Sequence, residues 1–171
     1  MGQGIGTLAG LLVAFALTFL ILSIGVAIPP EVIDPTIISD FLSRSDLELK
    51  LVIISTVLYP TTLSGVNIGI YIGYGARGSE VLMFLVWGTG GLVAGLLSRD
   101  IVQGLFAALF AVIIGAFLSW LLIFFVQTTD YAAIIGGESM LILQVVLEGA
   151  LYPAIASVVG GLLGGGISRP R

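Results

Sequence analysis

The stretch "LYPTTLSGVNIGIYIGYG", residues 58–75, is apolar enough for a membrane segment but carries features that a membrane disfavours. Pro60 has no backbone N–H, and Thr61, Thr62, Ser64 and Asn67 add polar side chains. A related stretch, "LYPAIASVVGGLLGGG", follows at residues 151–166. The central question is whether these polar groups form a functional site inside the membrane or only shape two packed helices.

The composition indicates that the solvent of this chain is lipid. Of 171 residues, 58% are hydrophobic and only 9% are charged, against about 25% charged in a soluble domain. The chain has no cysteine and no histidine, which excludes disulfides, haem attachment and typical zinc sites, so we expect no cofactor and no metal. A net charge of −4 makes nucleic acid an unsuitable partner.

Apolar runs predict an all-α, polytopic transmembrane bundle that forms a single integral membrane domain over residues 1–171. A hydrocarbon core about 30 Å thick needs roughly 20 helical residues. Five runs qualify, and the third is the shortest: Ile5–Ile28, Leu49–Tyr74, Val81–Leu97, Ile101–Val126 and Met140–Gly165. The N-terminal run has no basic region before it, so we interpret it as a retained helix and not as a signal peptide.

Residues 29–48 are predicted to form an extramembrane loop with one short amphipathic helix at the membrane interface. Asp34 is an N-cap candidate, with Pro35 at the first helical position. Ser45 and Glu48 have capping-box spacing for the second span. Four apolar side chains share the predicted buried face of the short helix: Ile37, Ile38, Phe41 and Leu42.

The distribution of basic residues predicts an orientation for a five-span chain. The side that holds the N-terminus would carry Arg77 alone. The other side would carry Arg44, Lys50, Arg99, Arg169 and Arg171. Because Lys and Arg favour the cytoplasmic side, we expect a cell-membrane protein with its N-terminus outside and its C-terminus in the cytoplasm.

Two sequence matches suggest an internal repeat. At a shift of 93 positions, Leu58-Tyr59-Pro60 falls on Leu151-Tyr152-Pro153. At a shift of 100, Gln3-Gly4-Ile5 falls on Gln103-Gly104-Leu105. With a third span between the halves, the first and second spans would repeat as the fourth and fifth in inverted orientation, a pattern found in transporters. Chance similarity between apolar helices explains the matches equally well.

Pro60 and Pro153 are the candidate helix breaks. Each would free the carbonyl four residues earlier, at Thr56 or Gly149, and a freed carbonyl inside lipid needs a partner. The nearby hydroxyl candidates are Thr61, Thr62 and Ser64 in the second span and Ser157 in the fifth. One interpretation is a binding site between two broken helices. The other, which we favour, is a pair of kinks that allow close packing.

Glu148 is the one acidic residue well inside an apolar run. Gln144, Glu148 and Tyr152 are spaced four apart and share a helix face. An ionisable group at such depth is a functional candidate by default, although a structural hydrogen bond to another helix is the simpler alternative. Asn67 is the corresponding polar candidate of the second span.

Glycine is abundant, with 24 residues. Gly91 and Gly95 have small-xxx-small spacing, and a second group lies in the fifth span: Gly160, Gly161, Gly164 and Gly165. Small residues let helices approach closely, so we expect these glycines to be packing surfaces, either within the chain or between copies.

The pattern of residues favours a non-enzymatic membrane protein, because no nucleophile has a histidine partner and the clustered carboxylates lie in a charged loop. The leading hypothesis is a glycine-rich packing or accessory subunit of a homo-oligomer or of a larger membrane complex. The alternative is a small transporter or channel with a polar site between proline-broken helices two and five.

Overall fold

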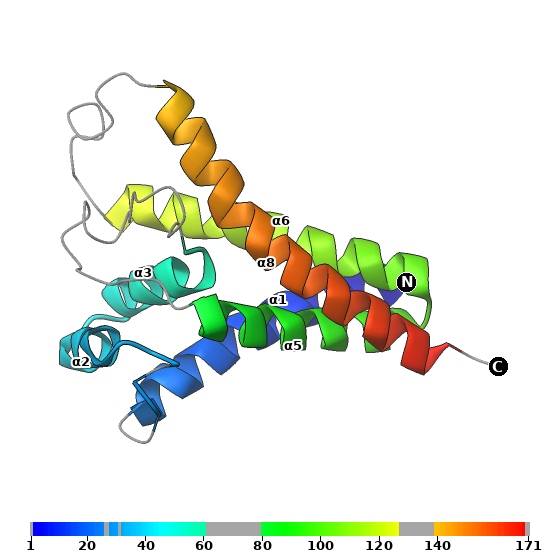
Figure 1. The fold of residues 1–171 in the computed structure, drawn as a ribbon, viewed down its shortest axis with the longest axis horizontal. Coiled ribbons are helices and arrows are strands. Elements are labelled where there is room, and N and C mark those ends of the chain that lie inside the picture. Colours follow the sequence, from blue (N-terminus) through cyan, green and yellow to red (C-terminus); the bar gives the residue numbers. More distant parts are fainter. Residues whose placement is uncertain (1, 26–27, 31, 61–79, 127–138, 170–171) are drawn as a thin grey trace.

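The computed structural model describes residues 2–25, 28–30, 32–60, 80–126 and 139–169, apart from the side chains of 123–126 and 139–148. All regular structure in these ranges is helical (Figure 1): α1 Gly2–Ile24, α2 Pro35–Ser43, α3 Leu47–Leu58, α5 Glu80–Ser98, α6 Ile101–Val126 and α8 Ser139–Ser168. Four of these helices, α1, α5, α6 and α8, are long and apolar enough to cross a membrane. The predicted all-α membrane bundle is confirmed.

The bounds of four predicted spans agree closely with the structure. The fourth, Ile101–Val126, coincides with α6, which begins where the Asp100 side chain accepts a hydrogen bond from the Gln103 N–H at 3.0 Å. The first ends earlier than expected, at Ile24, before the Pro29-Pro30 pair. A proline pair cannot continue a helix, and here the helix stops several residues before it.

The second predicted span, Leu49–Tyr74, differs from the structure. Its helix α3 ends at Leu58, with Tyr59 as C-cap and Pro60 outside the helix; residues 61–74 lie outside the described part of the chain. A residue that precedes proline is restricted to extended conformations, which explains the stop. Twelve residues extend about 18 Å, so α3 alone is about half as long as the bilayer core is thick.

The close contacts of glycines define the helix directions. Gly2 lies against Ser98, Gly6 against Ala94 and Gly10 against Gly90, so α1 and α5 are antiparallel. Gly104 approaches Gly161, and the Ser157 hydroxyl donates to the Ala108 carbonyl at 3.1 Å, so α6 and α8 are antiparallel.

The contacts between α5 and α8 progress in the same direction along both helices, which are therefore parallel. Gly91 meets Ser157, and Gly95 meets Gly161. Consequently α1 and α6 run one way and α5 and α8 the other (Figure 1).

These directions correct the expected topology. Gly2, the 98–100 turn and Ser168 lie at one end of the bundle, which we call the termini end (Figure 1). The opposite end, the α2 end, holds Ile24, α2 and the start of both α3 and α5. The end of α1 and the start of α5 thus lie at the same end of the bundle, whereas the five predicted spans put them at opposite ends.

The first and last described residues lie at the same end of the bundle (Figure 1), whereas the predicted orientation put the termini on opposite sides of the membrane. Which side of the membrane each terminus occupies stays a prediction. The prediction counted Arg44, Lys50, Arg99 and Arg169 on one side of the membrane. In the structure Arg44 and Lys50 lie at the α2 end, away from Arg99 and Arg169.

The predicted inverted repeat is not found either. Its paired helices, α1 with α6 and α3 with α8, run in the same direction. The parallel helices α5 and α8 share a sequence match that is closer than either match behind the inverted repeat: "GGLVAGLLSR" at 90–99 aligns with "GGLLGGGISR" at 160–169. Any internal repeat is therefore a parallel one, in which the hairpin of α6 and α8 corresponds to α1 and α5.

Helix α2 caps the α2 end. As predicted, Asp34 is its N-cap and accepts the Thr36 N–H at 2.9 Å, with Pro35 following. Ile37, Ile38 and Phe41 are buried, whereas Leu42 is 46% exposed. Phe41 packs edge-on to Phe19 of α1 at 5.6 Å, so the apolar face of α2 covers protein, in contrast to the predicted contact with the membrane interface.

The predicted capping box at the start of α3 is wrong. The N-cap is Asp46, which makes no side-chain capping bond, and the Ser45 hydroxyl donates to the Asp46 carboxylate at 3.2 Å. The hydroxyl is thereby used outside the helix, so it does not cap the first turn.

Candidate functional site

The structure describes only part of the predicted polar site. Thr61, Thr62, Ser64 and Asn67 lie outside the described residues. Gln144 and Glu148 are in the helical part of α8, but their side chains are not among those described. Thr56, Tyr152, Ser157 and the two prolines are described in full, and they allow a partial test.

Helix α3 ends in the middle of the bundle. Tyr59, its C-cap, donates its hydroxyl proton to the Val112 carbonyl of α6 at 2.9 Å. The space beside Gly115 is shared by the Tyr59 hydroxyl, Leu11 of α1 and Trp87 of α5. Leu11, Trp87 and Val112 all lie near the middle of their own helices, so the end of α3 is placed at mid-depth.

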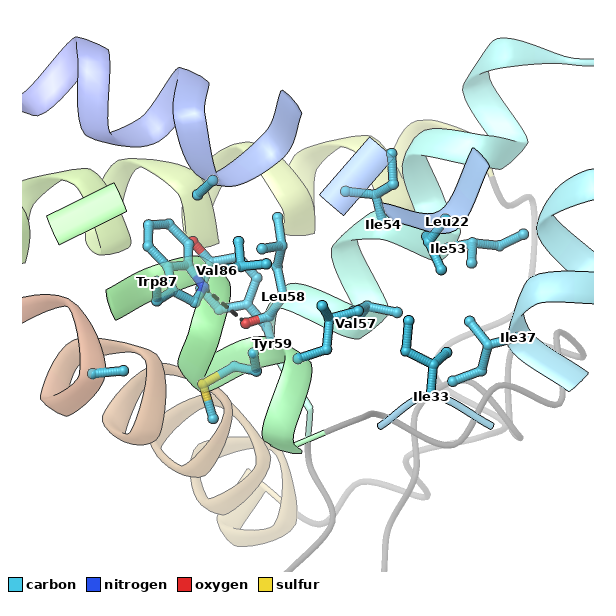
Figure 2. Packing of buried hydrophobic residues seen from close by; sticks show 14 of the residues in the cluster. Leu22, Ile33, Ile37, Ile53, Ile54, Val57, Leu58, Tyr59, Val86 and Trp87 are labelled. Carbon is cyan, nitrogen blue, oxygen red and sulfur yellow. Dashed lines mark hydrogen bonds between the residues drawn. The ribbon is translucent and has the colours of Figure 1, made fainter. Parts of the chain in front are cut away.

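Trp87 donates a hydrogen bond to a backbone carbonyl in the last turn of α3 (Figure 2). Its indole N–H donates to the Leu58 carbonyl oxygen at 3.0 Å, and its ring lies 5.5 Å from the Tyr59 ring. Carbonyls in the last turn of a helix lack intrahelical partners, and inside a membrane such a group must find another donor. Trp87 is itself fully buried, so this bond is shielded from solvent.

Most buried hydroxyls near α3 are bound to local carbonyls. Ser55 donates to the Leu51 carbonyl and Thr56 to the Ile53 carbonyl, both at 2.8 Å. Such bonds hide the hydroxyl from an apolar surrounding. Ser119 of α6 differs: it is 3% exposed, and its hydroxyl has no hydrogen-bond partner among the described residues.

Pro153 does not break its helix. It is buried inside α8, which continues without interruption to Ser168. The turns that follow are held by contacts: Ser157 bonds to Ala108, and Gly160 and Gly161 meet the backbones of α5 and α6. This packing outweighs the cost of a helical proline, about 3 kcal/mol. The expected helix break is therefore absent at Pro153, whereas before Pro60 the helix α3 ends at Leu58.

The predicted packing glycines all lie at contacts within the chain. A side chain at Gly91 would collide with the Ser157 carbonyl, and one at Gly95 with the Gly161 carbonyl. The others face backbone in the same way: Gly160 against Gly88, Gly161 against Gly104, Gly164 against Leu92 and Gly165 against Asp100. These surfaces are therefore occupied by the chain's own helices and do not supply an interface between copies.

The two helices that carry the prolines, or end before one, make their main contacts with different sets of helices. In the described residues α3 packs on α1, α2, α5 and α6, whereas α8 packs on α5 and α6. Tyr152 is half-buried beside the main core, and Ser157 is bonded to α6. Of the expected site between two broken helices, the described residues show one helix end, that of α3, and the site as a whole stays a prediction.

Sequence reasoning missed Trp87 and the role of Tyr59. Both residues look like ordinary members of an apolar run, although an indole N–H inside a span needs an acceptor, which was the available signal. Within the described ranges no cluster of three metal-ligating side chains occurs. What the α3 end offers chemically is polar backbone and hydroxyl groups at mid-depth.

No protein family, no curated protein and no solved structure matches this chain.

Proposed function

We propose that the protein is a non-enzymatic transporter or channel, in which α3 brings polar groups to the centre of the bundle. The observation that carries the proposal is the mid-depth end of a helix only half as long as a span. Helices interrupted at this depth are tolerated where they are buried in protein or line a polar cavity, and transporters use such ends to bind solutes.

The solute class follows from the polar residues near this end. Carbonyl and hydroxyl oxygens suit a cation, a proton or a small polar solute. Thr61, Thr62, Ser64 and Asn67 follow α3 directly in the sequence, and Glu148 supplies an acid in α8. In the proposed mechanism the oxygens replace the hydration shell of the solute, and Glu148 balances its charge.

Flux through reconstituted vesicles tests this function. Purified protein should pass protons or monovalent cations, and Glu148→Gln and Asn67→Leu should each reduce the flux while the protein stays folded. Asp46→Asn is the matched control, because Asp46 is exposed before α3 and makes no side-chain capping bond. Absence of flux in the unmodified protein, or flux unchanged in both test variants, would exclude the transport site.

A second candidate, an accessory subunit of an oligomer or larger complex, is favoured by a different observation. Helix α6 exposes a row of large apolar side chains, with Phe106 at 44%, Phe110 at 43% and Phe117 at 64%. In an oligomer this row would meet another subunit, whereas in a monomer it would meet lipid.

Single cysteines separate these two cases, because the chain has none of its own. Phe117→Cys should form disulfide-linked dimers in native membranes if α6 is an interface between copies. Leu20→Cys on α1, where Leu20 is 54% exposed, is the control. Equal cross-linking at both positions would indicate random collision and count against this interface.

A further inference from the structure

A groove of about 400 Å³ lies between α1 and α6 and opens to the outside of the bundle. Its lining includes Gln3, Gly4, Thr7, Leu11, Phe110 and Ile114. This volume is in the range of small-molecule pockets. Since four of the described helices are long and apolar enough to cross a membrane, we expect the open side of the groove to face lipid.

The length of the groove along α1 is close to the depth of one membrane leaflet. It runs along α1 from Gln3, beside the termini end, to Leu11 in the middle of the helix. At 1.5 Å per residue this is about 12 Å, close to half the thickness of a hydrocarbon core.

The lining of the groove changes from polar at its outer end to apolar at its deeper end, which is the direction that an amphiphilic lipid requires. Gln3 and Thr7 are at the outer end, whereas Leu11, Phe110 and Ile114 line the deeper part. At Gly4 a side chain would meet nothing within 4 Å, so the outer end is left open by the missing side chain.

A cation lies at the same end of the bundle as the outer end of the groove. Arg99 is exposed in the turn between α5 and α6, directly after Ser98, whose backbone lies against Gly2. Its backbone has a φ of 57°, a left-handed conformation that ends α5 at this position. A guanidinium binds phosphate oxygens in a bidentate manner.

We propose that this groove is a binding site for an anionic phospholipid, with one hydrocarbon chain between α1 and α6 and its phosphate on Arg99. Depth, polarity gradient and charge agree with this one occupant. The site is distinct from the proposed transport site, because it opens on the outer side of α1 and α6, although its deepest residue on α1, Leu11, lies beside the Tyr59 hydroxyl at Gly115.

Native mass spectrometry of protein extracted from equimolar phosphatidylglycerol and phosphatidylcholine vesicles tests the site. We expect one retained lipid per chain, predominantly phosphatidylglycerol, that excess inorganic phosphate does not displace. Gly4→Leu should abolish retention. Arg99→Gln should keep a lipid but lower the preference for phosphatidylglycerol about fivefold, since a basic residue near the membrane surface contributes about 1 kcal/mol.

Two matched variants make the test specific. Gly166→Leu adds the same side chain at another open glycine, on α8, and Arg169→Gln removes an exposed arginine at the end of that helix. Neither should change retention or preference. Equal retention of both lipids by the unmodified protein would overturn the proposed site. So would a control variant that changes lipid retention or preference as much as its matched test variant does.

Discussion

At the scale of single residues, glycines decide how closely the helices approach one another, because they have no side chain. Gly91 and Gly95 of α5 stand against backbone atoms of Ser157 and Gly161, with no room for a β-carbon. Membrane helices gain little hydrophobic energy from leaving lipid, so contacts of this kind carry much of their association. The stability of the α5–α8 pair therefore depends on individual glycines.

Gly91→Ala should lower the free energy of unfolding by about 2 kcal/mol, because α5 and α8 must move apart. Titration with sodium dodecyl sulfate, followed by circular dichroism, measures the change. Gly88→Ala is the control, since its nearest neighbour would be 3.9 Å away. That variant should be neutral or more stable by up to about 1 kcal/mol, from helix propensity alone. A similar loss in both variants would contradict the close contact.

At the scale of elements, α3 depends on bonds made by its neighbours. Its last turn is held at mid-depth by Trp87 of α5 and by Val112 of α6. Its first residues are held by α2, where the Lys50 amine lies 5.1 Å from the centre of the Phe41 ring. The two ends of this short helix are thus stabilised by tertiary contacts, because an isolated helix of this length is marginal.

Trp87→Phe should destabilise the fold by about 1–3 kcal/mol, because it leaves the buried Leu58 carbonyl without a donor. Tyr59→Phe should cost less, about 1 kcal/mol, because the Val112 carbonyl keeps its place in the hydrogen bonds of α6. The same detergent titration compares the variants. A larger loss for Tyr59→Phe would mean that the indole bond does not hold the end of α3.

The start of α2 offers a smaller test with its own control. Asp34→Ala removes a capping bond to the Thr36 N–H and should cost about 1 kcal/mol. Asp46→Ala at the start of α3 removes no capping bond and should change stability little. Thermal unfolding in detergent distinguishes them; equal shifts in the two variants would show that the Asp34 cap does not contribute.

At the scale of the whole molecule, the described residues hold four helices long and apolar enough to cross a membrane, and the directions of these helices decide the topology. Four spanning helices with α1 and α6 parallel place the first and last described residues at the same end (Figure 1). The loop that holds Arg44 and the turn that holds Arg99 are then on opposite sides.

Single-cysteine labelling in sealed vesicles checks this topology. Arg99→Cys and Arg169→Cys should react from one side with an impermeant maleimide, and Ser45→Cys from the other; all three native residues are exposed. Five crossings would instead put Ser45 on the same side as Arg169. That outcome would contradict the four-span arrangement.

Local sequence determined the helical class, four of the candidate spans and the start of α2, where Asp34 is the N-cap and Pro35 the first helical residue. The length of an apolar run and the conformational restriction of proline both act over local sequence. It also indicated that the glycines are packing positions. These features need no knowledge of which helix lies beside which.

Tertiary structure alone decided the rest. Pro60 and Pro153 follow the same Leu-Tyr pair, yet one stands after a helix end and the other inside a continuous helix. The difference comes from neighbours: Trp87 accommodates the end of α3, whereas α5 and α6 hold the turns after Pro153. The helix directions and the contact of Gly2 with the Ser98 backbone depend likewise on contacts between distant residues, which hydropathy and charge counts do not contain.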